Sequence, residues 1–303
     1  MEHPPAREID LRDMQPGGPN RHSEAGMRFQ AKLVDHLRAR GFPAYNPSPL
    51  VGERGPGDNY DPTNPAHLQE AGRGLARYHE AVRSFPHRFR ARGRLALPGL
   101  ERSGPYALAN FAGVAEAYLG PAGRARLTRA SSFLWSQFIR VPEALAGVLP
   151  DLTRLVIHGA YGPSALFYRD DRLAGVAGYD CAAYDLRAID LVHSLEAFAG
   201  VVEAAGGVGL DLERGAALMA AYRDVEPLPA HELAALPLIF RAQRLSGVLI
   251  GTSHFLRRHE VAFQPEEDAH QLVEMVEQEA DRARWLESGE QDVISALGGS
   301  LVA

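Results

Sequence analysis

The sequence predicts an α+β protein in which helices predominate and strands are few and short. Two observations carry this prediction. Apolar residues recur at helical spacing in several long segments, and one region, residues 154–180, places short runs of β-forming residues around turns. The composition is that of a globular protein, since 46% of the 303 residues are hydrophobic and 23% are charged.

The first 66 residues are expected to contribute little regular structure. Residues 1–22 are rich in proline, glycine and charge, and a helix is predicted from Ser23 to about Arg40. Residues 44–66 are rich in proline, which predicts a long irregular connection. The apolar face expected on the helix consists of Met27, Leu33, Val34 and Leu37.

Helical periodicity dominates the rest of the chain. Residues 68–82 repeat apolar side chains at helical spacing, and a second helix is indicated around Leu127, Leu134 and Phe138. A clear apolar face also recurs from Leu186 to Ala199. Further helices are predicted at 211–223, 231–257 and 266–287.

A small β-hairpin is predicted in the middle of the chain. The runs "RLVIHG" and "ALFY" are rich in apolar and β-forming residues, and "RDDR" is a turn that leads into "LAGVAGY". The hairpin is therefore expected to follow a loop that begins at His158.

Charge and cysteine content limit the function classes. The net charge of −6 argues against a protein built as a whole to bind phosphate backbones or anionic lipid. We expect no signal peptide in "MEHPPAREID" and no membrane span, and the single cysteine, Cys181, fits a reducing cytoplasm. Of the 32 Lys and Arg residues, only Lys32 is lysine.

The order of motifs after residue 150 resembles a known family. A loop that begins "HG" follows an apolar strand, and a hairpin then leads to "GVAGYD" and to the helix "YDLRAIDL". This order resembles the aminoglycoside phosphotransferase and homoserine kinase-like family, whose carboxyl-terminal lobe carries an H-G-D-x-x-x-x-N loop, a hairpin and an I-D-F segment. The segments "RFQAKLVDHLRARGFPA" and "GRGLARYHEAV" extend the resemblance towards the amino terminus.

The resemblance implies a protein-kinase-like fold, present mainly as its helical carboxyl-terminal lobe, with a reduced or absent amino-terminal sheet. We expect residues 1–66 to form a reduced amino-terminal lobe and connection, and residues 67–303 to form the helical lobe. About 22 residues precede the first predicted helix, which is too little chain for the family's nucleotide-binding sheet. Lys32, the only available lysine, lies in that helix, and Gln30 stands where the family has a glutamate.

The resemblance also implies phosphoryl transfer, in which a carboxylate accepts a proton and an amide and a second carboxylate bind magnesium. His158 and Gly159 match the start of the loop. The position of the catalytic aspartate holds Ala160, that of the metal-binding asparagine holds Ala165, and that of the metal aspartate holds Gly178. Three polar positions have therefore become small and non-polar.

Asp180 and His158 are the residual candidates for catalysis. Asp180 is a weak metal candidate, because magnesium near phosphates requires more than one anionic ligand. For His158 we favour a structural role within the loop over catalysis by its imidazole. Asp190 is expected to bind the loop backbone, since a buried carboxylate must find donors.

Several other features have a plain structural interpretation beside a functional one. Asp180, Asp185 and Glu196 could form an acidic pocket or could simply be solvated. A glycine-rich loop that binds phosphate follows a strand and begins a helix. The stretch "GERGPGDN", residues 52–59, neither follows a convincing strand nor begins a helix, so a plain loop is the expected structure. Cys181 is expected to be a small buried hydrophobe.

The segment from Arg83 to Arg102 is basic and contains phenylalanine, a mixture that can bind nucleic acid or an acidic partner. A solvated loop is the default interpretation. The candidates for anion binding in this segment are Arg88, Arg90 and Arg92.

Three functional hypotheses follow. The first is a pseudoenzyme that acts as a binding or regulatory module for an unidentified protein or small molecule, with no cofactor expected. The second is an active ATP- and magnesium-dependent small-molecule phosphotransferase with a rearranged site. The third is nucleic-acid or acidic-partner binding through the arginine segment.

Overall fold

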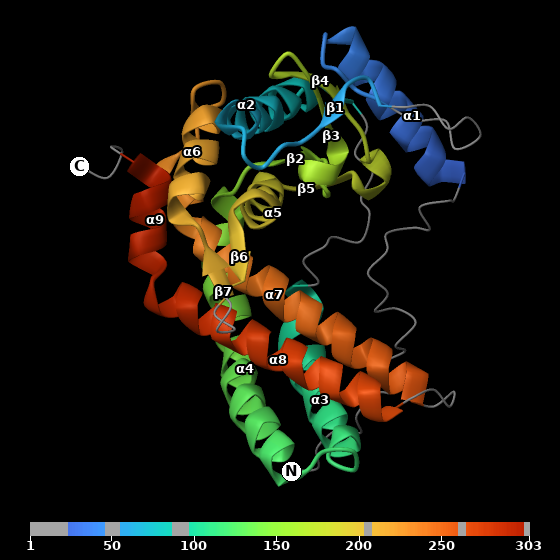
Figure 1. The fold of residues 1–303 in the computed structure, drawn as a ribbon, viewed down its shortest axis with the longest axis vertical. Coiled ribbons are helices and arrows are strands. Elements are labelled where there is room, and N and C mark those ends of the chain that lie inside the picture. Colours follow the sequence, from blue (N-terminus) through green and yellow to red (C-terminus); the bar gives the residue numbers. More distant parts are fainter. Residues whose placement is uncertain (1–23, 46–54, 87–96, 203–207, 260–264, 300–303) are drawn as a thin grey trace.

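The computed structural model describes residues 24–45, 55–86, 97–202, 208–259 and 265–299. The long helices α3, α4, α7 and α8 fill the lower half of Figure 1, and the strands β1 to β5 lie in the upper half beside α1, α2, α5 and α6. The α-helices among the described residues are α1 Glu24–Ala39, α2 Pro65–Val82, α3 Leu97–Ala115, α4 Pro121–Val148, α5 Arg187–Ala199, α6 Leu212–Arg223, α7 Ala230–His259, α8 Pro265–Ser288 and α9 Glu290–Gly298.

Within the described parts of the chain, the strands form three small antiparallel sheets with the orders β1-β3-β4, β2-β5 and β6-β7. The predicted hairpin is present as β3 and β4, joined by Asp170 and Asp171, both of which have positive φ angles. The strands are β1 Asp58–Asn59, β2 Arg154–Ile157, β3 Leu166–Arg169, β4 Arg172–Val176, β5 Ala183–Leu186, β6 Gly200–Val202 and β7 Val208–Leu210.

The connection at residues 44–66 is less irregular than its proline content predicts. Asp58 pairs with Tyr168 in β3, and Ala44 forms a parallel bridge to Val176 in β4. The described parts of this connection therefore flank the hairpin on both of its edges. Among the described residues, α1 and the two-residue β1 are the only regular elements before α2.

Most predicted helices are confirmed, with some corrections. On α1, Leu33, Val34 and Leu37 are buried, but Met27 is 52% exposed and Phe29 takes its place in the core. Helices α3 and α9 lie where the periodicity predicted none. Ser23, the expected helix cap, lies outside the described residues.

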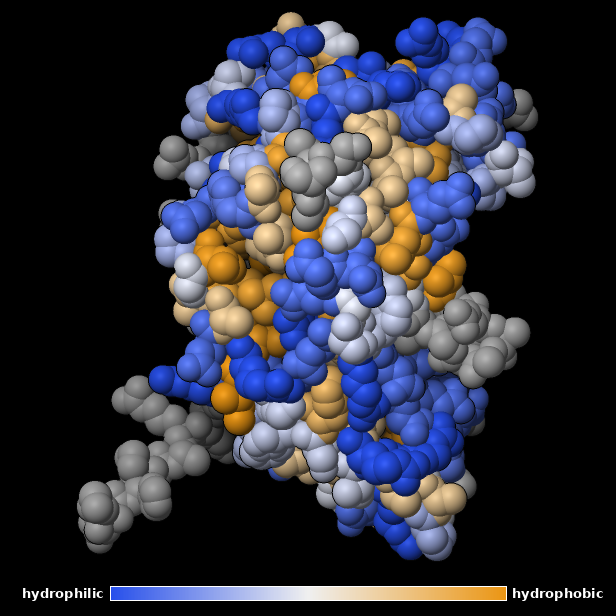
Figure 2. Space-filling view, turned by 90° about the vertical axis from the view of Figure 1, so that its left-hand side faces the viewer, coloured by the Kyte–Doolittle hydropathy of each residue, from blue (hydrophilic) through white to orange (hydrophobic). Residues whose placement is uncertain are grey.

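Helix α7 is an exception to the expectation that the chain has no membrane-length apolar segment. Residues Ala230–Leu256 are long and apolar enough to cross a membrane by length and composition. However, 72% of its most apolar window is buried within the protein, against α3, α4, α5 and α8. Figure 2 shows a face on which hydrophilic residues predominate and hydrophobic groups form smaller patches. Helix α7 is therefore the central core helix of this fold.

Candidate functional site at the His158 loop

The loop that begins at His158 connects β2 to a short 3-10 helix, Pro163–Ala165, and then to β3. The imidazole of His158 is fully buried, and both of its nitrogens have backbone partners. Nε2 lies 2.8 Å from the carbonyl oxygen of Ala177, and Nδ1 accepts from the Ala160 N–H at 3.3 Å. Because both imidazole nitrogens form hydrogen bonds with the backbone, His158 holds the loop next to Ala177, which follows β4.

Burial lowers the pKa of His158, and this effect outweighs the opposing charge of Asp190. A neutral imidazole agrees with the hydrogen bonds, since one nitrogen donates to a carbonyl and the other accepts from an N–H. The geometry therefore supports the structural role that we favoured for this histidine.

Asp190, in the first turn of α5, binds the loop backbone as expected. Its two carboxylate oxygens accept from the N–H groups of His158 and Gly159, each at 2.7 Å, and the residue is fully buried. Burial alone would raise the pKa of Asp190, but its hydrogen bond to His79, its electrostatic interactions with His79 and His158 and the Gly159 N–H together hold the pKa below its usual value. Asp190 is therefore an ionised anchor for the loop.

The support of this anchor extends across distant parts of the chain. His79 of α2 lies 3.2 Å from Asp190 through Nε2 and 2.8 Å from the hydroxyl of Tyr222 in α6 through Nδ1. Arg187, only 1% exposed, binds Glu226 at 2.9 Å and Glu232 at 2.8 Å. The role of His79 was not predicted, because 111 residues separate it from Asp190 and its own helix presents it as an ordinary core position.

The three substituted positions lie close together. Gly178 has a φ of +85°, and a Cβ built there would lie 3.7 Å from Cε1 of His158 and 4.0 Å from Cβ of Ala165. The Ala177 N–H also donates to the carbonyl of Ala165 at 2.8 Å. Ala160 is partly exposed, and its N–H donates to Nδ1 of the same His158 at 3.3 Å. The backbone thus brings near His158 the three positions at which the sequence resemblance implies polar groups.

The residues at these positions do not fit a magnesium ion. Ala160, Ala165 and Gly178 carry no side-chain oxygen, whereas magnesium needs oxygen ligands in near-octahedral geometry. Across the described ranges, no group of three or more His, Cys, Asp or Glu side chains is arranged to hold a metal ion. These three side chains therefore supply no magnesium ligand.

The other acidic candidates do not form one pocket. Asp180 is exposed in a short 3-10 helix, whereas Asp185 is 7% exposed in β5 and lies 3.7 Å from Arg154. Glu196 is bound by Arg244 and Arg282 on other helices. These contacts give no support to a shared acidic pocket of the three residues.

The remaining candidates are Cys181, Lys32 and the three arginines of the basic segment, and only Cys181 differs from expectation. Cys181 is partly exposed rather than buried, with its sulfur 3.9 Å from a carboxylate oxygen of Asp180. Lys32 is exposed on α1, so it lies on a helix as predicted. The anion-binding candidates Arg88, Arg90 and Arg92 lie outside the described residues, as do residues 52–54 of the glycine-rich stretch.

The fold is similar to those of solved kinase-like enzymes. An aminoglycoside phosphotransferase from Alicyclobacillus acidocaldarius superposes with a TM-score of 0.56 at 19% identity, covering 89% of this chain and 83% of that one. A microcompartment-associated aminopropanol kinase superposes with a TM-score of 0.56 at 18% identity and the same coverage. The fold is thus the α+β protein-kinase-like fold.

Sequence comparison assigns the family. The model of the phosphotransferase enzyme family matches residues 11–228, and the chain belongs to this family. A homoserine kinase of Phenylobacterium zucineum is 33% identical over 177 residues, which are 57% of this chain and 47% of that protein. A homoserine kinase of Parvibaculum lavamentivorans is 28% identical over 246 residues, 76% of this chain and 70% of that protein. In the first of these matches the chain spans about half the length of its relative.

Proposed function

We propose that this chain is a phosphotransferase-family member without phosphoryl-transfer activity, whose retained frame acts as a binding or regulatory module. The observation that carries this proposal is the contrast between the retained contacts that hold the loop and the side chains at three nearby positions. Asp190 and His158 hold the loop backbone through short hydrogen bonds, while Ala160, Ala165 and Gly178 offer neither a base nor a metal ligand. Among the residues that the structure describes before α2, only the two-residue β1 belongs to a sheet, and the single lysine is exposed on α1; both observations also support the proposal. We further propose a cytoplasmic location.

Calorimetric titration with ATP and GTP, each with and without magnesium, tests this proposal. We expect no magnesium-dependent nucleotide binding in the micromolar range, because the side chains that would hold the ion are missing. Clear magnesium-dependent binding of micromolar affinity would contradict the proposal.

A variant that combines Ala160→Asp, Ala165→Asn and Gly178→Asp provides the matched comparison. At Gly178 the left-handed backbone is one that aspartate tolerates better than most residues, and the nearest atoms leave room for a Cβ. We expect this variant to bind Mn²⁺ in a spectroscopic titration, whereas the unmodified chain does not. Equal Mn²⁺ binding by both proteins would show that the substituted positions are not the missing ligands.

The second candidate function is an active small-molecule phosphotransferase that uses Asp180. It is favoured by one observation: Asp180 is exposed in the turn that follows Gly178, and its charge acts on the imidazole of His158. This candidate predicts slow ATP-dependent phosphorylation of a small hydroxyl-bearing acceptor. A detected activity that survives Asp180→Asn unchanged would eliminate it.

A further inference from the structure

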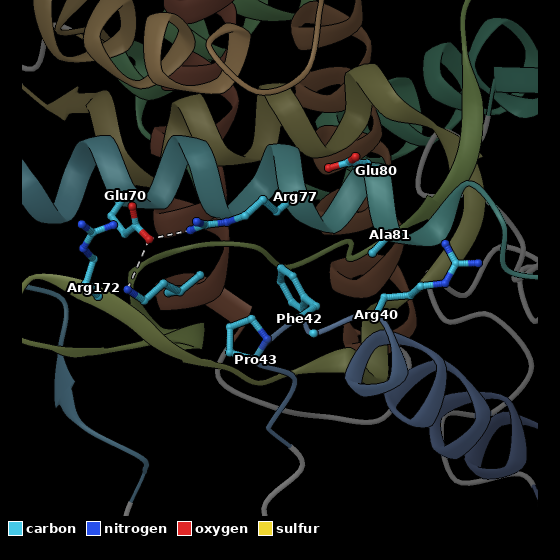
Figure 3. A pocket seen from close by; sticks show the side chains of 10 residues that line it. Arg40, Phe42, Pro43, Glu70, Arg77, Glu80, Ala81 and Arg172 are labelled. Atoms are coloured by element: carbon cyan, nitrogen blue, oxygen red, sulfur yellow. Dashed lines mark hydrogen bonds and ion pairs between the residues drawn. The ribbon is translucent and has the colours of Figure 1, made fainter.

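A pocket of about 480 Å³ lies between the end of α1, helix α2 and the start of β4 (Figure 3). Its volume falls in the range of sites that bind small organic molecules. The pocket is separate from the His158 loop, because it is lined by the face of α2 that carries Glu70 and Arg77, whereas His79 of the same helix is directed to Asp190.

Glu70 is the buried acidic group of this pocket, and one of its carboxylate oxygens accepts two hydrogen bonds. It is 5% exposed, and its Oε1 accepts from Nη2 of Arg77 at 2.5 Å and from the N–H of Leu173 at 3.5 Å. Nη1 of Arg73 lies 4.0 Å from the other carboxylate oxygen. The carboxylate is therefore neutralised by the protein itself.

The arginines at the pocket are left with donors to spare. Arg172 and Arg40 form no ion pair or side-chain hydrogen bond with any residue that the structure describes, and the side chain of Arg77 is 40% exposed although its Nε is buried. Figure 3 shows Arg77 and Arg172 near Glu70 at one end of the pocket and Arg40 beside Ala81 at the other. The end near Glu70 thus carries the guanidinium of Arg172 in addition to the Arg77–Glu70 ion pair, and the exposed carboxylate of Glu80 lines the pocket further along α2.

The wall between these ends is apolar. Phe42 and Leu173 line it and are 5% and 9% exposed, and Pro43 lies beside Phe42. Guanidinium groups bind planar or tetrahedral oxyanions through paired N–H donors, and such bonds are stronger than those between neutral groups. The pocket therefore combines oxyanion donors with a surface that suits an apolar group.

We propose that this pocket binds a small organic oxyanion, a carboxylate or a phosphate monoester attached to an apolar group. Arg77 and Arg172 hold the anionic group, and Phe42 and Leu173 contact the apolar group. This inference does not depend on whether the chain transfers phosphate, since none of these residues belongs to the His158 loop.

Calorimetric titration of the full chain with phenyl phosphate and with benzoate tests the proposal, and benzyl alcohol serves as the uncharged probe. We expect saturable binding of at least one of the two anions and none of benzyl alcohol. Tighter binding of phenyl phosphate would identify a phosphate ligand, and tighter binding of benzoate a carboxylate. Failure of both anions to bind, or equal binding of benzyl alcohol, overturns the proposal.

Arg172→Gln is expected to weaken anion binding about tenfold, because a charge-assisted hydrogen bond is lost. Arg129→Gln is the matched control, since Arg129 is exposed on α4 outside the pocket, and it should bind as the unmodified chain does. Arg77→Lys keeps a charge beside Glu70 but loses the paired donors, and it should also weaken binding. Unchanged affinity in both pocket variants, with normal thermal unfolding, would overturn the site.

Discussion

Asp190 is the side chain on which the shape of the His158 loop depends. Two backbone N–H groups and His79 converge on its buried carboxylate. A buried acceptor of this kind is strongly coupled to its partners, because removing it leaves several buried donors without a hydrogen bond.

Asp190→Asn is therefore expected to lower the free energy of unfolding by about 2–4 kcal/mol. Urea denaturation followed by circular dichroism measures this change. Asp180→Asn is the control, because Asp180 is exposed and its replacement should leave the free energy of unfolding unchanged. Equal stability of the two variants would show that the bonds of Asp190 do not hold the loop.

His158 predicts a loss of stability in mild acid. Its pKa is lowered in the folded protein from an ordinary value of 6.5, so the unfolded chain takes up a proton first as the pH falls. The free energy of unfolding should therefore begin to fall below about pH 6.5. The lowered pKa of Asp190 acts only at more acidic pH, where its stabilising charge is lost as pH falls below its ordinary value of 3.8.

Urea denaturation at several values between about pH 7.5 and 5.5 checks this expectation. His158→Gln should show a shallower decline than the unmodified chain over this range, whatever its stability at neutral pH. Parallel declines in the two proteins would assign the acid sensitivity to other histidines.

At the scale of elements, helices α2 and α6 approach each other closely at Gly72. A Cβ at this position would lie 2.4 Å from the carbonyl oxygen of Leu218, a backbone atom that cannot rotate away. This contact brings Tyr222 of α6 into reach of His79 on α2. Because Gly72 has no side chain, α2 and α6 lie close enough for Tyr222 to form its hydrogen bond with His79, which in turn binds Asp190 below the loop.

Gly72→Ala is expected to destabilise the protein by about 1–3 kcal/mol through overpacking. Gly247→Ala provides the contrast, since Gly247 is exposed within α7 and a Cβ there meets no atom within 4 Å. That variant should gain about 0.5–1 kcal/mol from its higher helix propensity. Thermal unfolding of both variants tests the prediction, and a stable Gly72→Ala protein would contradict the close packing.

The sequence predicts individual helices and strands better than it predicts the contacts between them. Periodicity located α2 and α5, and the requirement that a buried carboxylate find donors located the role of Asp190. Helix α3 escaped prediction because it contains Pro105 and because small residues such as Gly104 weaken its apolar pattern. His79 and the pocket at Arg77 also escaped, since both depend on contacts between segments that are distant in the chain.

For the whole molecule, the net charge bears on whether the arginine segment, residues 83–102, binds nucleic acid. A net charge of −6 opposes non-specific attachment to nucleic acid, although Arg88, Arg90 and Arg92 form a local basic stretch. We expect no complex with single- or double-stranded DNA in a low-salt gel-shift experiment. A complex that weakens with salt and disappears when the three arginines are replaced by glutamine would establish the nucleic-acid hypothesis instead.

The buried pairs of Arg187 with Glu226 and Glu232 have a thermal consequence. The free-energy cost of removing charged groups from water decreases as temperature rises, whereas apolar stabilisation per unit area levels off. These two ion pairs, which join α5 to the segment around α6 and α7, therefore contribute more to the warm protein than to the cold one. The upper temperature limit of the fold is in this way set partly by its ionic groups and not by its apolar core alone.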